Sequence, residues 1–511
     1  MPDSPLPPYI EELNPDQKAA ALHGGAPLLI LAGAGSGKTR VITTKIAYLV
    51  DHENISPRSI LAVTFTNKAA AQMRERALAL TGEAGDAMIR TFHSFGAWIL
   101  RRHAGAAGLS STFSIYDDED SLSLLSLALP GREKPKLSLL AREISRAKDY
   151  ALGPEDDLGG ITGDPEFAGA YRSYEEKLSQ AGNVDFGDLI LKPLKLFREH
   201  PEIKSRLRDR FKVILVDEYQ DSNVAQFELL KQLTGKDTYL CVVGDDDQSI
   251  YGFRGAEVKN ILTFGDSFPG AQVIRLEQNY RSTGEILKAA GAVVAHNRRR
   301  LGKTLWTANP PGRKPAFYYL ADHEEEAKFC LSLLAEGNGE GTAILYRTNA
   351  QSAHFETLFT RRRVPYRIVG ARRFYEREEV KDVIAYLRLF NNPGDEVSFR
   401  RIINKPKRGL GEQGVERIAG AGPPGRSPAD FWEAAGEVLK GAGPGKGRLS
   451  PNARKGLEEF LALRESLGEF RERPLQEFVE QLIRRSGLLE LYKDRDSIIA
   501  RQKQQNLEQM V

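Results

Sequence analysis

A phosphate-binding loop constrains the fold of this chain more than any other feature of its sequence. The apolar residues 28–31 (LLIL) run into the segment AGAGSGKT, residues 32–39, and a helical pattern follows over 39–50. A buried strand, a tight loop and a helix N-terminus in that order turn backbone N–H groups and the positive end of the helix dipole toward a phosphate. The strict pattern opens with Gly where this chain has Ala32, and an ordinary Gly-rich turn is the structural alternative. The GKT ending favours a nucleotide site for ATP or GTP.

The residues of this loop have distinct expected roles. We expect Lys38 to reach the β- and γ-phosphates and the Thr39 hydroxyl to bind Mg²⁺. The remaining loop residues are expected to hold the nucleotide through their backbone; they are Ala32, Gly33, Ala34, Gly35, Ser36 and Gly37.

Acidic and amide side chains follow two further apolar runs. Residues 213–218 (VILVDE) place Asp217 and Glu218 at a strand end, and residues 239–245 (YLCVVGD) lead to Gln248. Ligands of parallel sheets bind at the carboxyl ends of the strands, so we expect Asp217 to bind Mg²⁺ and Glu218 to deprotonate the attacking water. Gln248 is placed to sense the γ-phosphate. A capped helix start is the alternative for an isolated Asp-Glu pair.

Aromatic and polar side chains after other strands predict a surface for single-stranded nucleic acid. Tyr251, Phe253 and Arg254 combine two rings with a cation, which suits stacking on bases. A second candidate group follows two earlier strands and comprises Thr64, Phe65, Thr66, Asn67 and His93. Helix-capping Thr and Asn with a buried Phe explain that group equally well. Further on, Tyr280 and Arg281 suit adenine stacking and a charge on the γ-phosphate.

The order of apolar runs predicts an α/β protein with a parallel sheet covered on both faces. The expected strands are residues 28–33, 60–66, 88–93, 213–218, 239–245 and 272–277, with helices over 39–50, 67–80 and 94–103. Residues 106–185 are polar and predict a helical insertion. A second α/β run is expected to have strands at 342–347 and 366–370 and helices at 282–296, 350–362 and 376–390. Flexible loops are expected at 419–428 and 440–451.

Composition adds few constraints. The 511 residues carry a net charge of +3, so a polyanion site must be a local patch. The basic clusters 298–300, 361–363 and 405–408 are each interpreted as solvated faces. No apolar run is long enough for a membrane span, and the N-terminus lacks a signal pattern, which predicts a cytoplasmic protein. Cys241 and Cys330 are expected to be reduced, buried thiols without zinc.

Taken in order, the motifs resemble those of superfamily 1 DNA helicases of the UvrD/Rep/PcrA type. The matching segments are LNPDQ (13–17), AGAGSGKT (32–39), TFTNKAA (64–70), TFHSF (91–95), FSIYD (113–117), VDFGDLIL (184–191), VDEYQDSN (216–223), GDDDQSIYGFRGA (244–256), LEQNYRS (276–282), AILYRTNAQS (343–352), VPYRIVG (364–370), NKPKRGLG (404–411) and NLEQMV (506–511).

The resemblance implies a RecA-like P-loop NTPase domain with a helical insertion, and a second RecA-like domain that also carries one. It places the first domain at 1–108 and 186–279, its insertion at 109–185, the second domain at 280–390 and its insertion at 391–511. It further implies that Gln17 reads the adenine edge, that Arg40 and Tyr280 enclose the adenine ring, and that Arg281 is an arginine finger. Phe186 joins the residues expected to contact DNA, and Phe253 stands where many relatives have Trp.

The implied activity is ATP- and Mg²⁺-dependent 3′-to-5′ translocation on single-stranded DNA, in repair or replication restart. The family's last motifs do not appear before residue 511, so we expect an incomplete second RecA-like domain. The alternative is a nucleotide-dependent DNA-binding module without motor activity, and an RNA-directed ATPase is a weaker one. Expected partners are single-stranded DNA and single-/double-strand junctions, with no membrane. Self-association and accessory repair proteins are left open.

Overall fold

The computed structural model describes residues 6–336, 341–369, 374–423, 427–442, 449–493 and 498–511. The chain divides into two compact units, each formed by three stretches. The first unit is Met1–Arg313, Arg388–Arg400 and Gly409–Leu461, and the second is Lys314–Leu387, Arg401–Arg408 and Ala462–Val511. The domain boundaries expected from the resemblance remain a prediction.

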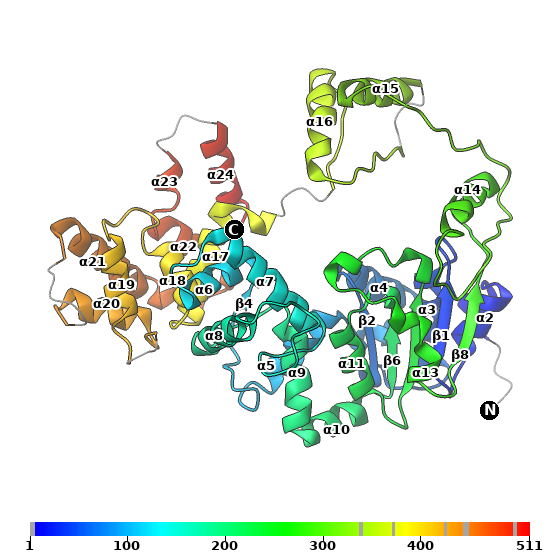
Figure 1. Ribbon diagram of the computed structural model, residues 1–511, viewed down its shortest axis with the longest axis horizontal. Helices are drawn as coiled ribbons and strands as arrows, with labels where there is room; N and C mark the ends of the chain where they lie inside the picture. Colours follow the sequence, from blue (N-terminus) through cyan, green and yellow to red (C-terminus); the bar gives the residue numbers. More distant parts are fainter. Residues whose placement is uncertain (1–5, 337–340, 370–373, 424–426, 443–448, 494–497) are drawn as a thin grey trace. The chain divides into compact units, whose positions relative to one another are not determined.

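The first unit contains a six-stranded parallel sheet (Figure 1). Its strands are β1 (Leu28–Ala32), β2 (Ile60–Thr64), β3 (Met88–Thr91), β6 (Val213–Val216), β7 (Tyr239–Gly244) and β8 (Gln272–Leu276). Their order across the sheet is β3-β2-β6-β7-β1-β8, and every pairing is parallel. All six strands expected from the apolar runs are therefore confirmed, which confirms the α/β class with a parallel sheet.

Helices cover both faces of this sheet because successive strand residues point to opposite sides. Leu28 and Ile30 of β1 pack with the helices that follow β1 and β2, whereas Leu29 and Leu31 pack with helices on the opposite face, among them the one that follows β3. The helices of this sheet domain are α1 (Pro8–Glu11), α2 (Pro15–Leu22), α3 (Lys38–Asp51), α4 (Asn67–Leu80), α5 (Phe92–Arg102), α9 (Asp188–Glu199), α10 (Pro201–Arg210), α11 (Val224–Leu233), α12 (Lys259–Leu262), α13 (Phe264–Ser267) and α14 (Gly284–Val294).

The start of α5 differs by two residues from the expected 94–103. Thr91 accepts a hydrogen bond from the Ser94 amide, and the Ser94 side chain accepts one from the Thr91 amide, forming a capping box. The helix therefore begins at Phe92, and His93 lies in its first turn.

The expected helical insertion lies between α5 and α9. It consists of α6 (Asp118–Ala128), α7 (Lys134–Asp149), α8 (Phe167–Gln180) and a short parallel pair, β4 (Ile115–Tyr116) with β5 (Val184–Asp185). Its core is separate from the sheet cores and is built around Tyr171, Leu125 and Ile144. The Lys148 ammonium is buried there between Glu175, Asp185 and Asp188, at 2.5, 2.6 and 2.8 Å.

Helices are the main regular secondary structure among the described residues of the C-terminal half. Its helices are α15 (His323–Glu336), α16 (Ser352–Arg361), α17 (Glu378–Asn391), α18 (Glu396–Ile402), α19 (Glu412–Ala419), α20 (Phe431–Leu439), α21 (Pro451–Ser466), α22 (Leu475–Arg485), α23 (Glu490–Lys493) and α24 (Ile498–Glu508). The loops expected at 419–428 and 440–451 lie partly outside the described residues.

The two strands expected at 342–347 and 366–370 are wrong for the residues that the structure describes there. A strand requires a hydrogen-bonded neighbour, and no described segment pairs with either of them. Leu345 is 90% exposed and Val369 is 84% exposed, whereas Ile344 packs against the small core of Ala327, Phe355 and Phe359. The run 342–347 therefore contacts a core through Ile344 but forms no strand. Residue 370 lies outside the described residues.

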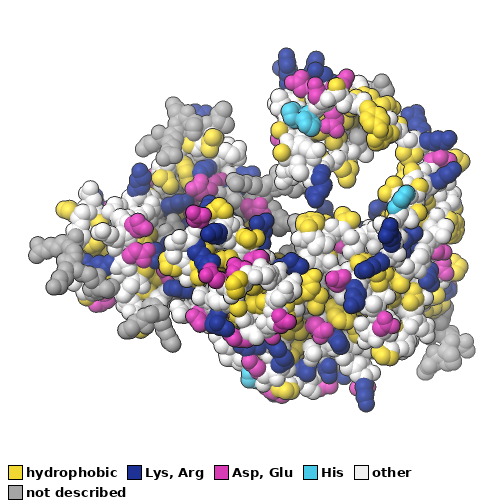
Figure 2. Space-filling model, viewed as in Figure 1, with side chains coloured by type: hydrophobic (Ala, Val, Ile, Leu, Met, Phe, Trp, Pro, Cys, Tyr) yellow, Lys and Arg dark blue, Asp and Glu magenta, His cyan; other side chains and the backbone are white. Residues whose placement is uncertain are grey.

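Two expectations about charged clusters are also corrected. Arg300 forms an ion pair with Asp247 at 2.8 Å, and Arg408 is 7% exposed and donates to the Ile402 carbonyl. Both clusters therefore contain structural cations as well as solvated ones. Over the visible face, basic and acidic side chains are interspersed, as expected for a net charge of +3 (Figure 2).

The remaining predictions from composition are met in part. Cys241 is buried, whereas Cys330 is only partly buried, and both thiols are free. Among the described residues, no helix combines the length and the apolar character needed to cross a bilayer.

Candidate functional site

The phosphate-binding loop lies at the carboxyl end of β1 and leads into α3. Ala32 is the last residue of β1 and is fully buried in an extended conformation, which explains why Gly is not required there. Gly35 and Gly37 have φ of +68° and +88°, a region that favours glycine. Gly37 precedes the first turn of α3, whose unpaired N–H groups form an anion site. The loop expected from the sequence therefore has the required geometry.

Lys38 and Glu218 form the charged centre of this edge. The Lys38 ammonium lies 3.1 Å from the Glu218 carboxylate, although the two residues are far apart in sequence. Glu218 has φ 52° and ψ 44°, a left-handed conformation that costs a non-glycine residue free energy. Such strain is frequent at functional sites, and here it turns the Glu218 side chain toward the loop.

Asp217 lies beside this pair at the end of β6 and is almost completely buried. Burial and the nearby Glu218 carboxylate raise the pKa of Asp217 to about 7. The Lys38 ammonium offsets only part of the negative charge of Asp217 and Glu218, and a hard divalent cation such as Mg²⁺ would neutralise the rest. Asp217 and the Thr39 hydroxyl are suitable oxygen ligands for such an ion.

A second set of contacts joins the loop to the segments expected to bind the adenine. The buried Gln17 side chain donates to the Ser36 carbonyl at 2.9 Å. The Tyr280 amide donates to the Gly35 carbonyl at 2.9 Å, and its hydroxyl accepts from Asn14 at 2.8 Å. Arg40 pairs with Glu12 at 2.8 Å on the surface. The structure thus brings Gln17, Arg40 and Tyr280 to the loop, and their contacts with a nucleotide remain a prediction.

Gln248 and Arg281 also lie at this edge. The Gln248 side chain donates to the Asp245 carboxylate directly after β7. A Cβ atom at Gly35 would lie 2.8 Å from Cβ of Arg281, so this arginine lies directly beside the phosphate-binding loop. The approach of both side chains to the γ-phosphate remains a prediction.

Sequence reasoning missed several polar residues that connect these groups. Gln220 donates to Glu218 at 2.8 Å and accepts from the Asp245 amide at 2.9 Å. The Asn279 side-chain amide donates a hydrogen bond to the Ala34 carbonyl at 2.5 Å. Gln220 lies within the motif VDEYQDSN and Asn279 within LEQNYRS, so the motifs themselves could have pointed to both residues.

Aromatic side chains gather at the neighbouring part of the same edge. The Phe65 and Tyr251 rings stack at 5.3 Å, and Tyr251 lies 5.9 Å from Phe253. The His93 and Phe186 rings stack at 4.1 Å. A cavity of about 930 Å³ is lined by Phe65, His93, Phe186 and Phe253, together with polar residues of α7.

The exposure of these rings suits stacking on bases. Phe186 and Phe253 are 56% and 69% exposed, and Phe65 is partly exposed rather than buried. Burial lowers the pKa of His93 to about 4, so this ring is neutral near pH 7.

The other residues that were expected to contact DNA differ in their structural surroundings. Thr66 accepts from the Ala69 amide and caps α4, which Asn67 begins, as the structural alternative predicted. Thr64 is fully buried. The Arg254 side chain lies outside the described part of the chain. DNA contact by these residues remains a prediction.

The strand order explains how the two groups are related. The aromatic groups Phe65 and His93 follow β2 and β3 at one side of the sheet. The phosphate-binding loop follows β1, near the other side, and β6 and β7 lie between them. The loops after β6 and β7, which carry Glu218 and Gln248, therefore connect the two sites.

Comparison with known proteins identifies relatives over nearly the whole chain. A family model described as the UvrD/REP helicase N-terminal domain matches residues 13–269, and one described as the UvrD-like helicase C-terminal domain matches residues 274–423. The ATP-dependent DNA helicase UvrD1 of Mycobacterium bovis is 42% identical over 510 residues, which cover 95% of this chain and 65% of the relative. The ATP-dependent DNA helicases PcrA of Staphylococcus epidermidis and Staphylococcus aureus are each 39% identical, covering 98% of this chain and 70% of the relative. The chain thus spans about 65% of the length of the mycobacterial relative.

Proposed function

Because the chain belongs to the UvrD/REP helicase family, we propose that it is an ATP-dependent motor that moves 3′-to-5′ along single-stranded DNA. The observation that carries the proposal is the pairing of Lys38 with Glu218 beside the buried Asp217. A site that only bound nucleotide would need the loop and its lysine. A carboxylate held beside them supplies the general base that hydrolysis requires.

Different residues of the chain have separate roles in the proposed hydrolysis. The amides at the start of α3 and the Lys38 ammonium bind the phosphates, which compete with Glu218 for that lysine. Glu218, still held by Gln220, then accepts the proton of the attacking water. Gln248 and Arg281 approach the γ-phosphate, where an amide and a guanidinium stabilise developing negative charge. Asp217 and Thr39 would hold Mg²⁺, which neutralises phosphate charge when bound.

The aromatic cavity is the proposed path of the DNA strand. Phe65, Tyr251 and Phe253 provide rings on which successive bases stack without sequence preference. Because Tyr251 lies three residues after Gln248, a change at the γ-phosphate has a short route to the stacking surface. Alternating grip on the bases would convert each hydrolysis cycle into a step. A role in repair or replication restart, at single-/double-strand junctions and with accessory proteins, belongs to the same proposal.

Steady-state ATP hydrolysis with and without single-stranded DNA tests the proposal. We expect DNA to stimulate turnover and Glu218→Gln to abolish it while nucleotide binding persists. Glu83→Gln is the matched control, because Glu83 is exposed in the turn that precedes β3, away from the carboxyl edge. Nucleotide-responsive DNA binding without any turnover would instead support a binding module without motor activity.

Direction is measured separately. Streptavidin is attached to biotin at either end of an oligonucleotide, and its release on ATP addition is followed. Faster release from the 5′ end supports 3′-to-5′ movement, and faster release from the 3′ end contradicts it.

A further inference from the structure

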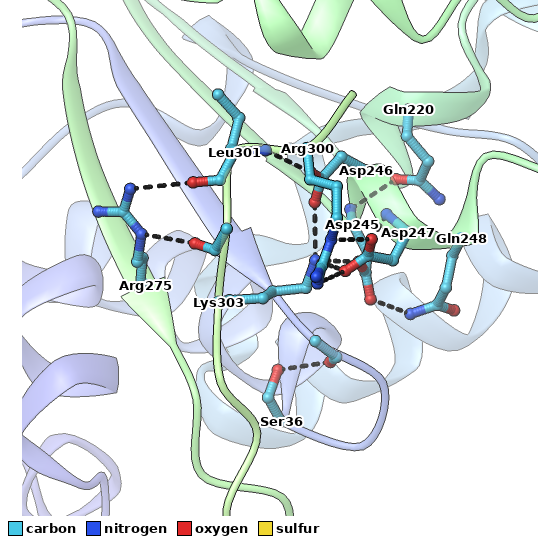
Figure 3. Close-up of polar contacts among 12 residues, drawn as sticks. Ser36, Gln220, Asp245, Asp246, Asp247, Gln248, Arg275, Arg300, Leu301 and Lys303 are labelled. Carbon is cyan, nitrogen blue, oxygen red and sulfur yellow. Dashed lines mark hydrogen bonds and ion pairs between the residues drawn. The ribbon is translucent and has the colours of Figure 1, made fainter. Parts of the chain in front are cut away.

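A segment that follows α14 returns to the carboxyl edge of the sheet, where it covers the loop after β7 (Figure 3). We call residues 300–306 the return segment. The Arg275 guanidinium of β8 donates to the Leu301 and Gly302 carbonyls at 3.4 and 3.1 Å. The Trp306 amide donates to the Glu277 carbonyl at 3.0 Å, and the Trp306 carbonyl accepts from Asn279 at 2.7 Å. The return segment is therefore fixed at one end to β8 and at the other end to the residues that follow β8.

Lys303 of this segment is buried among three consecutive carboxylates. Its ammonium lies 2.6 Å from Asp245, 2.7 Å from Asp246 and 2.6 Å from Asp247, and its side chain is only 2% exposed. Burial by itself lowers a lysine pKa, but hydrogen bonds and charge from the aspartates raise that of Lys303 above its ordinary value. Arg300 adds a bidentate pair with Asp247 at 2.8 Å. Two cations thus neutralise most of the charge of three buried carboxylates.

Asp245 connects Lys303 to the proposed hydrolysis site. One of its oxygens accepts from Lys303, and the other accepts from the Gln248 side chain. Its amide donates to Gln220, which in turn donates to Glu218. An uninterrupted chain of polar contacts therefore runs from Lys303 through Asp245 to both Gln248 and Glu218.

We propose that Lys303 is a positioning residue for Gln248, because it fixes the Asp245 carboxylate that holds the Gln248 amide. Without Lys303, three carboxylates repel each other and the phosphates nearby, and Asp245 loses its fixed orientation. An ammonium has three tetrahedral donors for three carboxylates, whereas a planar guanidinium presents its donors in one plane. This inference rests on the proposed function, in which Gln248 approaches the γ-phosphate.

The kinetic test uses Lys303→Gln with Arg300→Gln as the matched control. Both variants remove one cation from the return segment, but only Lys303 contacts Asp245. We expect Lys303→Gln to lower kcat of DNA-stimulated hydrolysis about 10- to 100-fold, as a misplaced catalytic group does, with little change in KM for ATP. Arg300→Gln should lower kcat less. Equal losses in both variants would overturn the proposal.

A double-mutant cycle separates positioning from general damage. If Lys303 acts through Gln248, Lys303→Gln causes no further loss of kcat in a Gln248→Ala background. Losses that multiply in the double variant would contradict a role through Gln248. Lys303→Arg keeps the charge and should fold even if Lys303→Gln does not. Its kcat should still fall, because the guanidinium cannot reproduce the three contacts, and full activity would overturn the proposal.

Hydrogen exchange measured by mass spectrometry tests the same inference without turnover. The amides of Asp245, Asp247 and Gln248 are all hydrogen-bonded around the Asp245 side chain and backbone. Lys303→Gln should accelerate exchange in a peptide spanning 245–251 more than Arg300→Gln does, and unchanged exchange would contradict the proposal. If the wild-type chain does not hydrolyse ATP, the proposed function is refuted. The exchange experiment does not depend on hydrolysis, so it still decides the role of Lys303.

Discussion

Gly96 is the residue whose substitution should most directly disturb the proposed DNA path. It lies in α5, one turn after His93, where α5 crosses the start of α9. A Cβ atom built at Gly96 would lie 1.7 Å from the Leu189 carbonyl oxygen of α9. His93 and Phe186, which stack at 4.1 Å, lie on the two sides of this crossing. We therefore predict that Gly96→Ala forces the two helices apart and opens the stack.

The size of the effect follows from the distances. Ordinary van der Waals contact begins at 3.4 Å, so the carbonyl must move by 3.4 − 1.7 = 1.7 Å, and backbone of a helix is not easily displaced. Overpacking of this kind costs about 1–3 kcal/mol of unfolding free energy. Loss of one stacked base costs about 1–3 kcal/mol of binding, so the dissociation constant for single-stranded DNA should rise about fivefold or more.

Urea unfolding and fluorescence anisotropy with a labelled oligonucleotide measure the two effects. Gly169→Ala is the control, because Gly169 is an exposed residue of α8 with no atom near its added Cβ. Replacing a helical glycine in open space should stabilise the protein by about 0.5–1 kcal/mol. If Gly96→Ala matched the wild type in both stability and DNA affinity, the close approach of α5 and α9 would be refuted.

Three further predictions concern the insertion and the aromatic groups. Lys148→Met removes the ammonium nearest to Asp185, Asp188 and Glu175 and leaves Lys192, 3.3 Å from Asp188, as the remaining cation. Urea unfolding should therefore show a loss of about 3–5 kcal/mol, and wild-type stability would contradict the buried network. Because burial depresses the pKa of His93 to about 4, the unfolded chain binds a proton there at a higher pH than the folded chain. Stability from this residue is complete above about pH 6.5 and falls by up to about 2 kcal/mol between pH 7 and 5, a dependence that His93→Asn should remove. Phe253→Ala should weaken single-stranded DNA binding by about 1–3 kcal/mol in anisotropy titrations, and an unchanged affinity would exclude this ring from the DNA path.

Much of the sheet domain could be predicted from short stretches of sequence. Apolar runs predicted the six strands, and the Gly-rich segment predicted the phosphate-binding loop, in which Gly35 and Gly37 have positive φ. These features depend on residues within one turn or one strand of each other, where sterics and hydrogen bonding act locally. The expected strands at 342–347 and 366–370 were wrong in the described residues, since a strand also requires a neighbour that local composition does not supply.

Which charged residues meet depends on the fold and not on their neighbours along the chain. The cluster containing Arg300 was interpreted as a solvated face, and Lys303 received no role, because nothing near them in sequence is a partner for either cation. The fold brings Lys303 to Asp245–Asp247 and Lys148 to Asp185 and Asp188, where burial makes each pairing obligatory. The strand, loop and helix that form the phosphate site follow from residues that are neighbours along the chain. The return of distant segments to the sheet edge determined how its catalytic groups are held, since Coulomb interactions depend on distance in space and not along the chain.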